Sequence, residues 1–229
     1  GAIVEVNTAT RTFRRFVDLY RQKSGVAPSP DLRESAWWFP LKSKLYGAVD
    51  IQVMTFNIRN GKAQDGENRW DLRKAFVCDV IRDDAPDVLG VQEAYRFQLD
   101  AFNERLPDYG EVGIGRDGGS EGEHSSILYL KQRFDVDESG TFWLSDTPMK
   151  PSASWGNRYR RICTWARLID KTSARSLYVY NTHLDHQSQP ARENGAQLIM
   201  KRIAERTHED PFILMGDFNA SESNQVVAY

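Results

Sequence analysis

The sequence predicts an α/β domain in which mixed β-sheets are covered by helices. From residue 50 onward, short apolar strands alternate with segments of helical spacing, the order typical of sheets with helices on their faces. Helical crossovers lie near both ends of this region and strand-rich sequence fills its middle, so we expect both parallel and antiparallel strand pairs. With 229 residues, 40% hydrophobic and 27% charged, the chain has ordinary globular composition.

Residues 1–49 are predicted to form an N-terminal extension, which precedes a main domain at residues 50–229. One helix is expected here, because four apolar side chains recur with helical spacing while arginines occupy the other faces. Such a basic amphipathic helix either packs on the main domain or touches a membrane surface or a partner. The apolar stripe consists of Phe13, Phe16, Val17 and Tyr20.

The first half of the main domain is predicted to run strand, helix, strand, helix. Residues 51–58 alternate in polarity as a half-buried strand does, and residues 87–91 form a short apolar run. Apolar residues at helical spacing occupy 72–81 and 97–106, and Pro107 ends the second of these helices.

The second half is richer in strands. Strands are expected at residues 126–130, 141–144, 162–169, 176–181 and 211–215. A long helix is predicted from about Ala191 to Arg206, because Pro190 suits the first turn of a helix. The last strand therefore follows a helical crossover, as in a parallel pair.

Polar residues typical of ligand sites lie on or directly after four of these strands. Asn57 lies in the first strand, Gln92-Glu93 follow the second, and Asn181-Thr182-His183-Leu184-Asp185-His186 and Gly216-Asp217-Phe218-Asn219-Ala220 follow two later ones. Ionisable groups next to buried strands are costly unless they are paired or metal-bound. Since ligand sites of α/β sheets collect at strand ends, we expect the four clusters to converge.

The residue types in these clusters favour phosphate chemistry with a divalent cation. Glu93 and Asp217 offer the hard oxygen ligands that Mg²⁺ or Mn²⁺ prefers. Asn57 and Asn219 can orient water or phosphate oxygens, and His183 can donate a hydrogen bond to developing negative charge. Each cluster alone has an ordinary structural explanation, because an Asp at a strand end is often a cap or turn residue.

These motifs, beginning with Met54-Thr55-Phe56-Asn57, resemble those of the endonuclease/exonuclease/phosphatase (DNase I-like) superfamily. The segments at 115–118, 122–125 and 140–145 are similar to a bacterial-type branch of metal-dependent hydrolases. The resemblance covers about Asp50 to Ala220 and implies a four-layer sandwich, with two mixed β-sheets facing each other and helices outside.

The resemblance also implies roles for individual residues. Glu93 would be the principal Mg²⁺ (or Mn²⁺) ligand with Asn57 and Asp217 beside it. Asp217 would also activate the attacking water, Asn219 would hold that water or a phosphate oxygen, and His183 would stabilise the pentacovalent phosphorane. The implied reaction is in-line attack of water on a phosphate ester. Glu123 would orient His183, and the remaining candidates for substrate binding are Glu123, Arg116, Asp185, His186, Arg158 and Arg161.

Two of these arginines permit a second interpretation. Arg158 and Arg161 flank Tyr159, which is consistent with a grip on phosphates beside a stacking aromatic ring. Equally, they are outward-facing arginines of a strand whose other face points inward. A different site is also conceivable at 181–186, which is similar to an H-x-H-x-D-H zinc motif, although the chain has only four histidines to complete it.

The chain departs from the superfamily pattern at its C-terminus. A late Asp and a terminal Ser-Asp-His are expected downstream of Asn219, and the sequence ends at Tyr229 without them. We therefore expect a domain truncated at its C-terminus. The alternatives are a catalytically inactive scaffold of the same fold, or a partner chain that supplies the missing motifs.

Charge and composition limit the partners. The net charge of −2 disfavours sequence-independent coating of nucleic acid, and no apolar run approaches the ~18 residues of a membrane span. Two cysteines cannot form a disulfide framework. A phosphate-ester substrate is expected, whether nucleic acid, phospholipid or a small phosphodiester, and the compartment stays open between cytoplasmic and secreted.

Overall fold

The computed structural model describes residues 36–41 and 50–228, so the helix predicted at residues 13–20 lies outside the described residues. The described residues form two mixed β-sheets. The first contains, in order across the sheet, β1 (Ala36–Leu41), β2 (Ile51–Asn57), β3 (Val88–Gln92), β5 (Ile127–Leu130) and β4 (Tyr109–Val112). The second contains β6 (Phe134–Trp143), β7 (Ile162–Asp170), β8 (Ser176–His183) and β9 (Phe212–Asp217).

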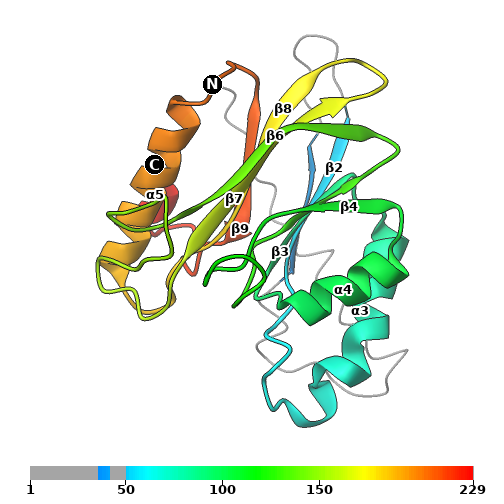
Figure 1. The fold of residues 1–229 in the computed structure, drawn as a ribbon, viewed down its shortest axis with the longest axis horizontal. Coiled ribbons are helices and arrows are strands. Elements are labelled where there is room, and N and C mark those ends of the chain that lie inside the picture. The colour runs from blue at the N-terminus through cyan, green and yellow to red at the C-terminus, as the bar shows by residue number, and fades with distance from the viewer. Residues whose placement is uncertain (1–35, 42–49, 229) are drawn as a thin grey trace.

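Three α-helices cover the outer faces of these sheets (Figure 1): α3 (Trp70–Asp84), α4 (Arg96–Arg105) and α5 (Gln189–Ala204). Short 3₁₀ helices lie at η1 (Gly66–Asn68) and η2 (Gln225–Ala228). Because α3 connects the parallel strands β2 and β3, and α5 connects the parallel strands β8 and β9, each sheet contains one helical crossover. This arrangement confirms the predicted four-layer α/β sandwich.

Local sequence explains where the helices begin and end. Helix α3 stops where Ala85 adopts a left-handed φ of 43°, directly before Pro86, and α4 stops before Pro107. Helix α5 begins at Ser188, whose Oγ accepts a hydrogen bond from the Ala191 amide at 3.2 Å, with Pro190 in the first turn.

The sandwich has a separate apolar layer at each interface between elements. The outward face of the first sheet packs against α3 and α4, and the outward face of the second sheet packs against α5. Between the sheets lies a third cluster, to which both sheets contribute alternate residues of their strands. It includes Val53, Val88 and Ile127 from the first sheet and Leu168, Val179 and Met215 from the second.

Three strand segments differ from the sequence-based expectation. Residues 36–41, assigned to the N-terminal extension, form strand β1, which pairs antiparallel with β2 at the edge of the first sheet. Strand β4 and the first half of β6 were not predicted. Because β6 is an edge strand with one solvated face, its sequence Phe134–Trp143 carries exposed charges instead of an apolar run.

No helix among residues 36–41 and 50–228 is long and apolar enough to cross a membrane.

Buried amides connect the two sheets. Gln92 and Asn181 are only 1% and 0% exposed, and the Gln92 Nε2 donates to the Asn181 Oδ1 at 2.7 Å. The Asn181 amide in turn donates to the backbone oxygens of Val91 and Ser126 at 3.0 and 2.8 Å. A Cβ at Gly90 would lie 2.8 Å from the Asn181 oxygen, so only glycine leaves room for this contact. The two sheets are therefore held in a fixed relative position by a satisfied polar network.

We predict that Asn181→Ala lowers the free energy of unfolding by roughly 2–4 kcal/mol, because it leaves buried groups of the first sheet without partners and opens a cavity. Urea denaturation monitored by circular dichroism measures this loss. The control is Asn103→Ala at an exposed position of α4, which is expected to lower the free energy of unfolding by less than about 0.5 kcal/mol. Equal costs for the two variants would contradict the proposed importance of the buried network.

Candidate active site at the strand ends

Four predicted site residues lie at the carboxyl ends of parallel strands. Asn57 is the last residue of β2 and Glu93 directly follows β3, while His183 and Asp217 are the last residues of β8 and β9. His183 and Asp217 are paired in register in the second sheet. Because β2 and β3 face β8 and β9 across the sandwich, these ends meet in one place.

Asn57 joins the two sheets at this point. Its Nδ2 donates to the Glu93 Oε1 and to the Asp217 Oδ2, both at 2.9 Å. The distance between the Glu93 Oε1 and the Asp217 Oδ2 therefore cannot exceed the sum of these two hydrogen-bond lengths. Glu93 and Asp217, which lie 36 and 160 positions after Asn57 in the sequence, thus share one donor nitrogen.

The loop after β2 completes the surroundings of Glu93. The backbone amide of Asn60 donates to the Glu93 Oε2 at 2.8 Å, and the amide of Arg59 donates to the Asn57 Oδ1 at 3.0 Å. Arg59 and Glu93 both have a φ of 61°, a region that non-glycine residues rarely occupy. Such backbone strain concentrates at functional sites, where the surrounding structure maintains it. Asn60 was not predicted as a site residue, because its contact with Glu93 comes from the backbone.

Asp217 is positioned by the loop after β9. Its Oδ1 accepts a hydrogen bond from the Asn219 amide at 3.0 Å, and the Asn219 side chain donates to the Leu184 oxygen at 3.0 Å. Asn219 also has a left-handed φ, at 47°. The loop after β9 therefore holds the Asp217 carboxylate in place, and the Asn219 side chain attaches this loop to the residue after β8.

His183 faces this carboxylate, with 3.6 Å between its Nε2 and the Asp217 Oδ2. Burial, and next the positive charge of Arg161, lowers the pKa of His183 far below its usual range. The imidazole is therefore neutral at pH 7. A neutral imidazole can donate one N–H bond to a phosphate oxygen without adding charge to the site.

Glu123, which the resemblance implied would orient His183, is bonded to two other residues. Its carboxylate pairs with the Arg116 guanidinium at 2.6 Å and accepts from the Asn60 side chain at 3.3 Å. Burial raises the pKa of Glu123 in spite of the opposing charge of Arg116. The contact with Arg116 is a charge-assisted hydrogen bond, which holds both side chains in place.

The motif that follows β8 gathers around a buried arginine. The Arg161 Nη2 lies 3.1 Å from the His186 Nδ1, and the Arg161 Nε lies 3.8 Å from the Asp185 Oδ2. The other oxygen of Asp185 accepts from the backbone amides of Gln187 and Ser188 at 2.8 and 2.7 Å. Asp185 therefore also shapes the turn that leads into α5.

An exposed aromatic ring lies beside these groups. Tyr159 is 41% exposed, and its ring stacks on the ring of His186 with 6.3 Å between the centroids. The guanidinium carbons of Arg116 and Arg158 lie 5.0 and 5.4 Å from the centre of the Tyr159 ring. Arg158 thus contacts the site through the Tyr159 ring. Arg161 is buried, which excludes for this residue the alternative of an outward-facing arginine on a strand.

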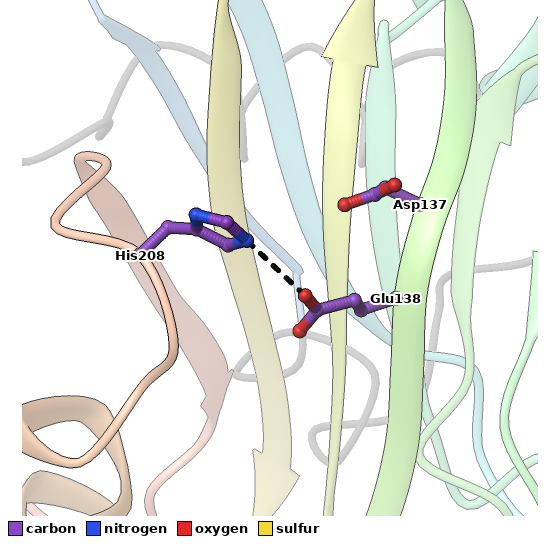
Figure 2. A group of neighbouring side chains, drawn as sticks. All are labelled: Asp137, Glu138 and His208. Carbon is purple, nitrogen blue, oxygen red and sulfur yellow. Dashed lines mark ion pairs between the residues drawn. The ribbon is translucent and has the colours of Figure 1, made fainter.

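A second group of potential metal ligands lies elsewhere. Among the described residues, Asp137, Glu138 and His208 bring ligand atoms within 4.8 Å of one another. Figure 2 shows the His208 ring pointing at Glu138, with 3.3 Å between Nε2 and Oε1. Asp137 and Glu138 lie in β6, and His208 precedes β9, so the group lies at the opposite end of β9 from Asp217. Asp137 already pairs with Arg167 at 2.5 Å, and the group is exposed enough to be a surface ion-pair network.

The residues at the strand ends fit a hard divalent cation. The two carboxylates approach the same uncharged amide group, so the point between Glu93 and Asp217 is one at which positive charge is favoured. Rotating the Asn57 amide would present its oxygen there instead of its nitrogen. Three oxygen donors without sulfur or imidazole suit Mg²⁺ or Mn²⁺ better than Zn²⁺.

Comparisons with known proteins agree with this geometry. The model of the endonuclease/exonuclease/phosphatase family matches residues 54–227. A crystal structure of an endonuclease/exonuclease/phosphatase from Bacteroides vulgatus is 36% identical, with a TM-score of 0.77 over 79% of this chain and 70% of that one. A mannosyl-6-phosphatase from Bacteroides thetaiotaomicron is also 36% identical, with a TM-score of 0.74 over 76% of this chain and 67% of that one.

A curated relative is more distant. Nocturnin from Drosophila melanogaster is 25% identical over 200 residues, which are 78% of this chain and 30% of that protein. The chain therefore spans less than a third of nocturnin, and about two thirds of the two bacterial structures.

We predict that Asn57→Asp lowers the free energy of unfolding by roughly 1–3 kcal/mol in the presence of a chelator, because it replaces a shared donor with a third carboxylate. Urea denaturation at pH 7 measures the effect. Asn194→Asp is the matched control, since the Asn194 amide donates to the carbonyl of Pro190 at an exposed position. A chelated Asn57→Asp variant as stable as its control would show that the Asn57 amide does not stabilise the two carboxylates.

Proposed function

The chain belongs to the endonuclease/exonuclease/phosphatase family, whose members are typically hydrolases of phosphate esters, and we propose that it is a phosphoesterase that uses Mg²⁺ or Mn²⁺. The observation that carries the proposal is the placement of Asn57, Glu93, His183 and Asp217 at adjoining strand ends. Arg116 in the loop after β4, and Arg158 and Arg161 in the loop before β7, supply positive charge for an anionic substrate. Residues 50–229 would form this domain and residues 1–49 an extension that includes β1.

The cation would be held by Glu93 and Asp217, with the Asn57 oxygen as a third ligand. When bound, it would polarise a phosphate oxygen and neutralise the negative charge that develops on it. Without this charge, the two carboxylates would repel a phosphate from the site.

The remaining steps belong to residues of the chain. Asp217 accepts the proton of the attacking water, while Asn219 keeps that water in line with the bond to be broken. Neutral His183 donates its N–H to a phosphoryl oxygen and so stabilises the pentacovalent transition state. The new bond joins the water oxygen to phosphorus, the bond to the ester oxygen breaks, and the leaving alcohol takes a proton from solvent.

The groups around Arg161 would bind the substrate. Arg116 and Arg161 provide positive charge beside His183, and Glu123 and Asp185 hold these guanidinium groups in place. His186 and Arg158 would complete the substrate-binding side around the Tyr159 ring. The substrate itself would be a phosphate ester such as a nucleic acid, a phospholipid or a small ester.

Glu93→Gln is expected to weaken Mg²⁺ binding at least about tenfold while leaving the fold intact, because the variant loses the charge of a principal ligand. Titration calorimetry measures the affinity, and circular dichroism checks the fold. Glu104→Gln, an exposed substitution on α4, should bind Mg²⁺ like the unsubstituted chain. Unchanged affinity in Glu93→Gln would remove this residue from the metal site.

Asp217→Asn is expected to lower phosphoesterase turnover with Mn²⁺ by about 10²–10⁴-fold, because the variant cannot accept a proton from water. The assay follows release of p-nitrophenol from bis-p-nitrophenyl phosphate and from p-nitrophenyl phosphate, using the longest natural form of the protein. Asp108→Asn, an exposed substitution, is the control. Undiminished turnover in Asp217→Asn would refute the assignment. If the unsubstituted protein binds the cation but turns over neither ester, the result favours a catalytically inactive scaffold or a requirement for motifs from a partner chain.

A further inference from the structure

Arg161 is a buried cation whose hydrogen bonds are incomplete. Its side chain is 5% exposed, and its Nε meets no acceptor in the described structure. Within residues 36–41 and 50–228, the only side-chain group that it meets at hydrogen-bond distance is the His186 Nδ1, at 3.1 Å from the Arg161 Nη2. A buried guanidinium is costly unless its donors are satisfied, so this arrangement calls for an acceptor that the protein does not itself supply.

Asp185 cannot be that acceptor in its present position. Its Oδ2 also lacks a partner and lies 3.8 Å from the Arg161 Nε, which is too far for a hydrogen bond. Its Oδ1 is held by the amides of Gln187 and Ser188, which restrains the carboxylate from moving toward Arg161. Asp185 therefore balances the charge of Arg161 without accepting a hydrogen bond from it. The Arg161 Nε–H is itself closed off from solvent, so a ligand can reach only the Nη donors.

The other charged groups nearby are already engaged. Arg116 neutralises Glu123 at 2.6 Å, and Glu93 is bonded by Asn57 and Asn60. Arg161 directly precedes β7, and Cys163 of β7 pairs with Thr182 of β8, so Arg161 lies at the end of β8 that carries His183. The His186 ring is held between Arg161 and Tyr159, which fixes the guanidinium from its other side.

We propose that the Nη donors of Arg161 bind a non-bridging oxygen of the substrate's phosphate, and that the substrate is therefore a phosphate monoester. This inference rests on the proposed function. In that function one non-bridging oxygen faces the cation held by Glu93 and a second accepts the His183 N–H. A phosphodiester has only these two, because its other oxygens carry ester groups. A monoester has a third, and its higher charge suits an additional buried cation.

The reaction would then join water to a phosphate monoester and release an alcohol and inorganic phosphate. Arg161 would hold the same phosphoryl group before and after the P–O bond breaks. It touches only non-bridging oxygens, so it selects among esters and takes no proton.

The first test measures binding to the unsubstituted chain in the presence of Mg²⁺. Titration calorimetry compares inorganic phosphate, which resembles the monoester end, with dimethyl phosphate, which resembles a diester. Inorganic phosphate is expected to bind at least about tenfold more tightly, because it alone satisfies the third donor. Equal affinities, or tighter binding of dimethyl phosphate, would overturn the proposal without any variant being made.

The second test replaces the guanidinium. Arg161→Lys keeps the charge but removes the planar fork, and it is expected to weaken inorganic phosphate binding about 10- to 100-fold while leaving dimethyl phosphate within about twofold. Arg160→Lys is the control, because the adjacent Arg160 pairs with Asp117 at the surface. Circular dichroism verifies that both variants fold. An equal loss for both ligands would assign Arg161 a general structural role and overturn the proposal.

Turnover separates this inference from the function on which it rests. With Mn²⁺, p-nitrophenyl phosphate is expected to give a higher kcat/KM than bis-p-nitrophenyl phosphate, and Arg161→Lys should reduce this ratio mainly by raising KM for the monoester. Preference for the diester, unchanged in Arg161→Lys, would overturn the monoester assignment and leave phosphoesterase activity standing. Absence of turnover on both esters, together with selective phosphate binding through Arg161, would overturn the proposed reaction and leave the anion site standing.

Discussion

The contact between Gln92 and Asn181 is the interaction on which the rest of the arrangement depends. Each side chain comes from a different sheet, and each is almost completely buried. A sandwich held only by apolar packing could shift one sheet along the other at modest cost, because such packing is not directional. Directional amide bonds, together with a glycine at position 90, remove that freedom. Glu93 is the next residue after Gln92, so its position relative to the second sheet follows from this contact.

At the mouth of the sandwich, opposite charges are separated into two halves. Glu93 and Asp217 gather where β2, β3 and β9 end, while Arg116 and Arg161 lie toward the loops that precede β7 and follow β4. His183 lies between the two halves and remains neutral because it is buried. An anionic ester approaching this site would meet arginines on one side and, on the other, carboxylates that require a cation. The net charge of the whole chain, −2, conceals this local separation.

Much of the fold was predictable because its signals are local. Both crossover helices and the four strands that bear the site residues have clear apolar periodicity, and proline residues mark the ends or starts of α3, α4 and α5. Strand β4 and the first half of β6 were not predicted, since a short strand and a solvated edge strand lack an apolar pattern. Strand β1 was assigned to the extension because its pairing with β2 is a property of the folded sheet.

The sequence by itself determined which residue types follow which strands, and motif order determined the family. It could not decide which of these polar residues hold the sheets together and which face the substrate. Only the tertiary structure assigned Asn181 to the buried network, paired Glu123 with Arg116, and brought the Asn60 amide to Glu93. The reason is physical: a hydrogen bond between distant residues depends on distances of a few tenths of an ångström, which are set by packing and leave no periodic trace in the sequence.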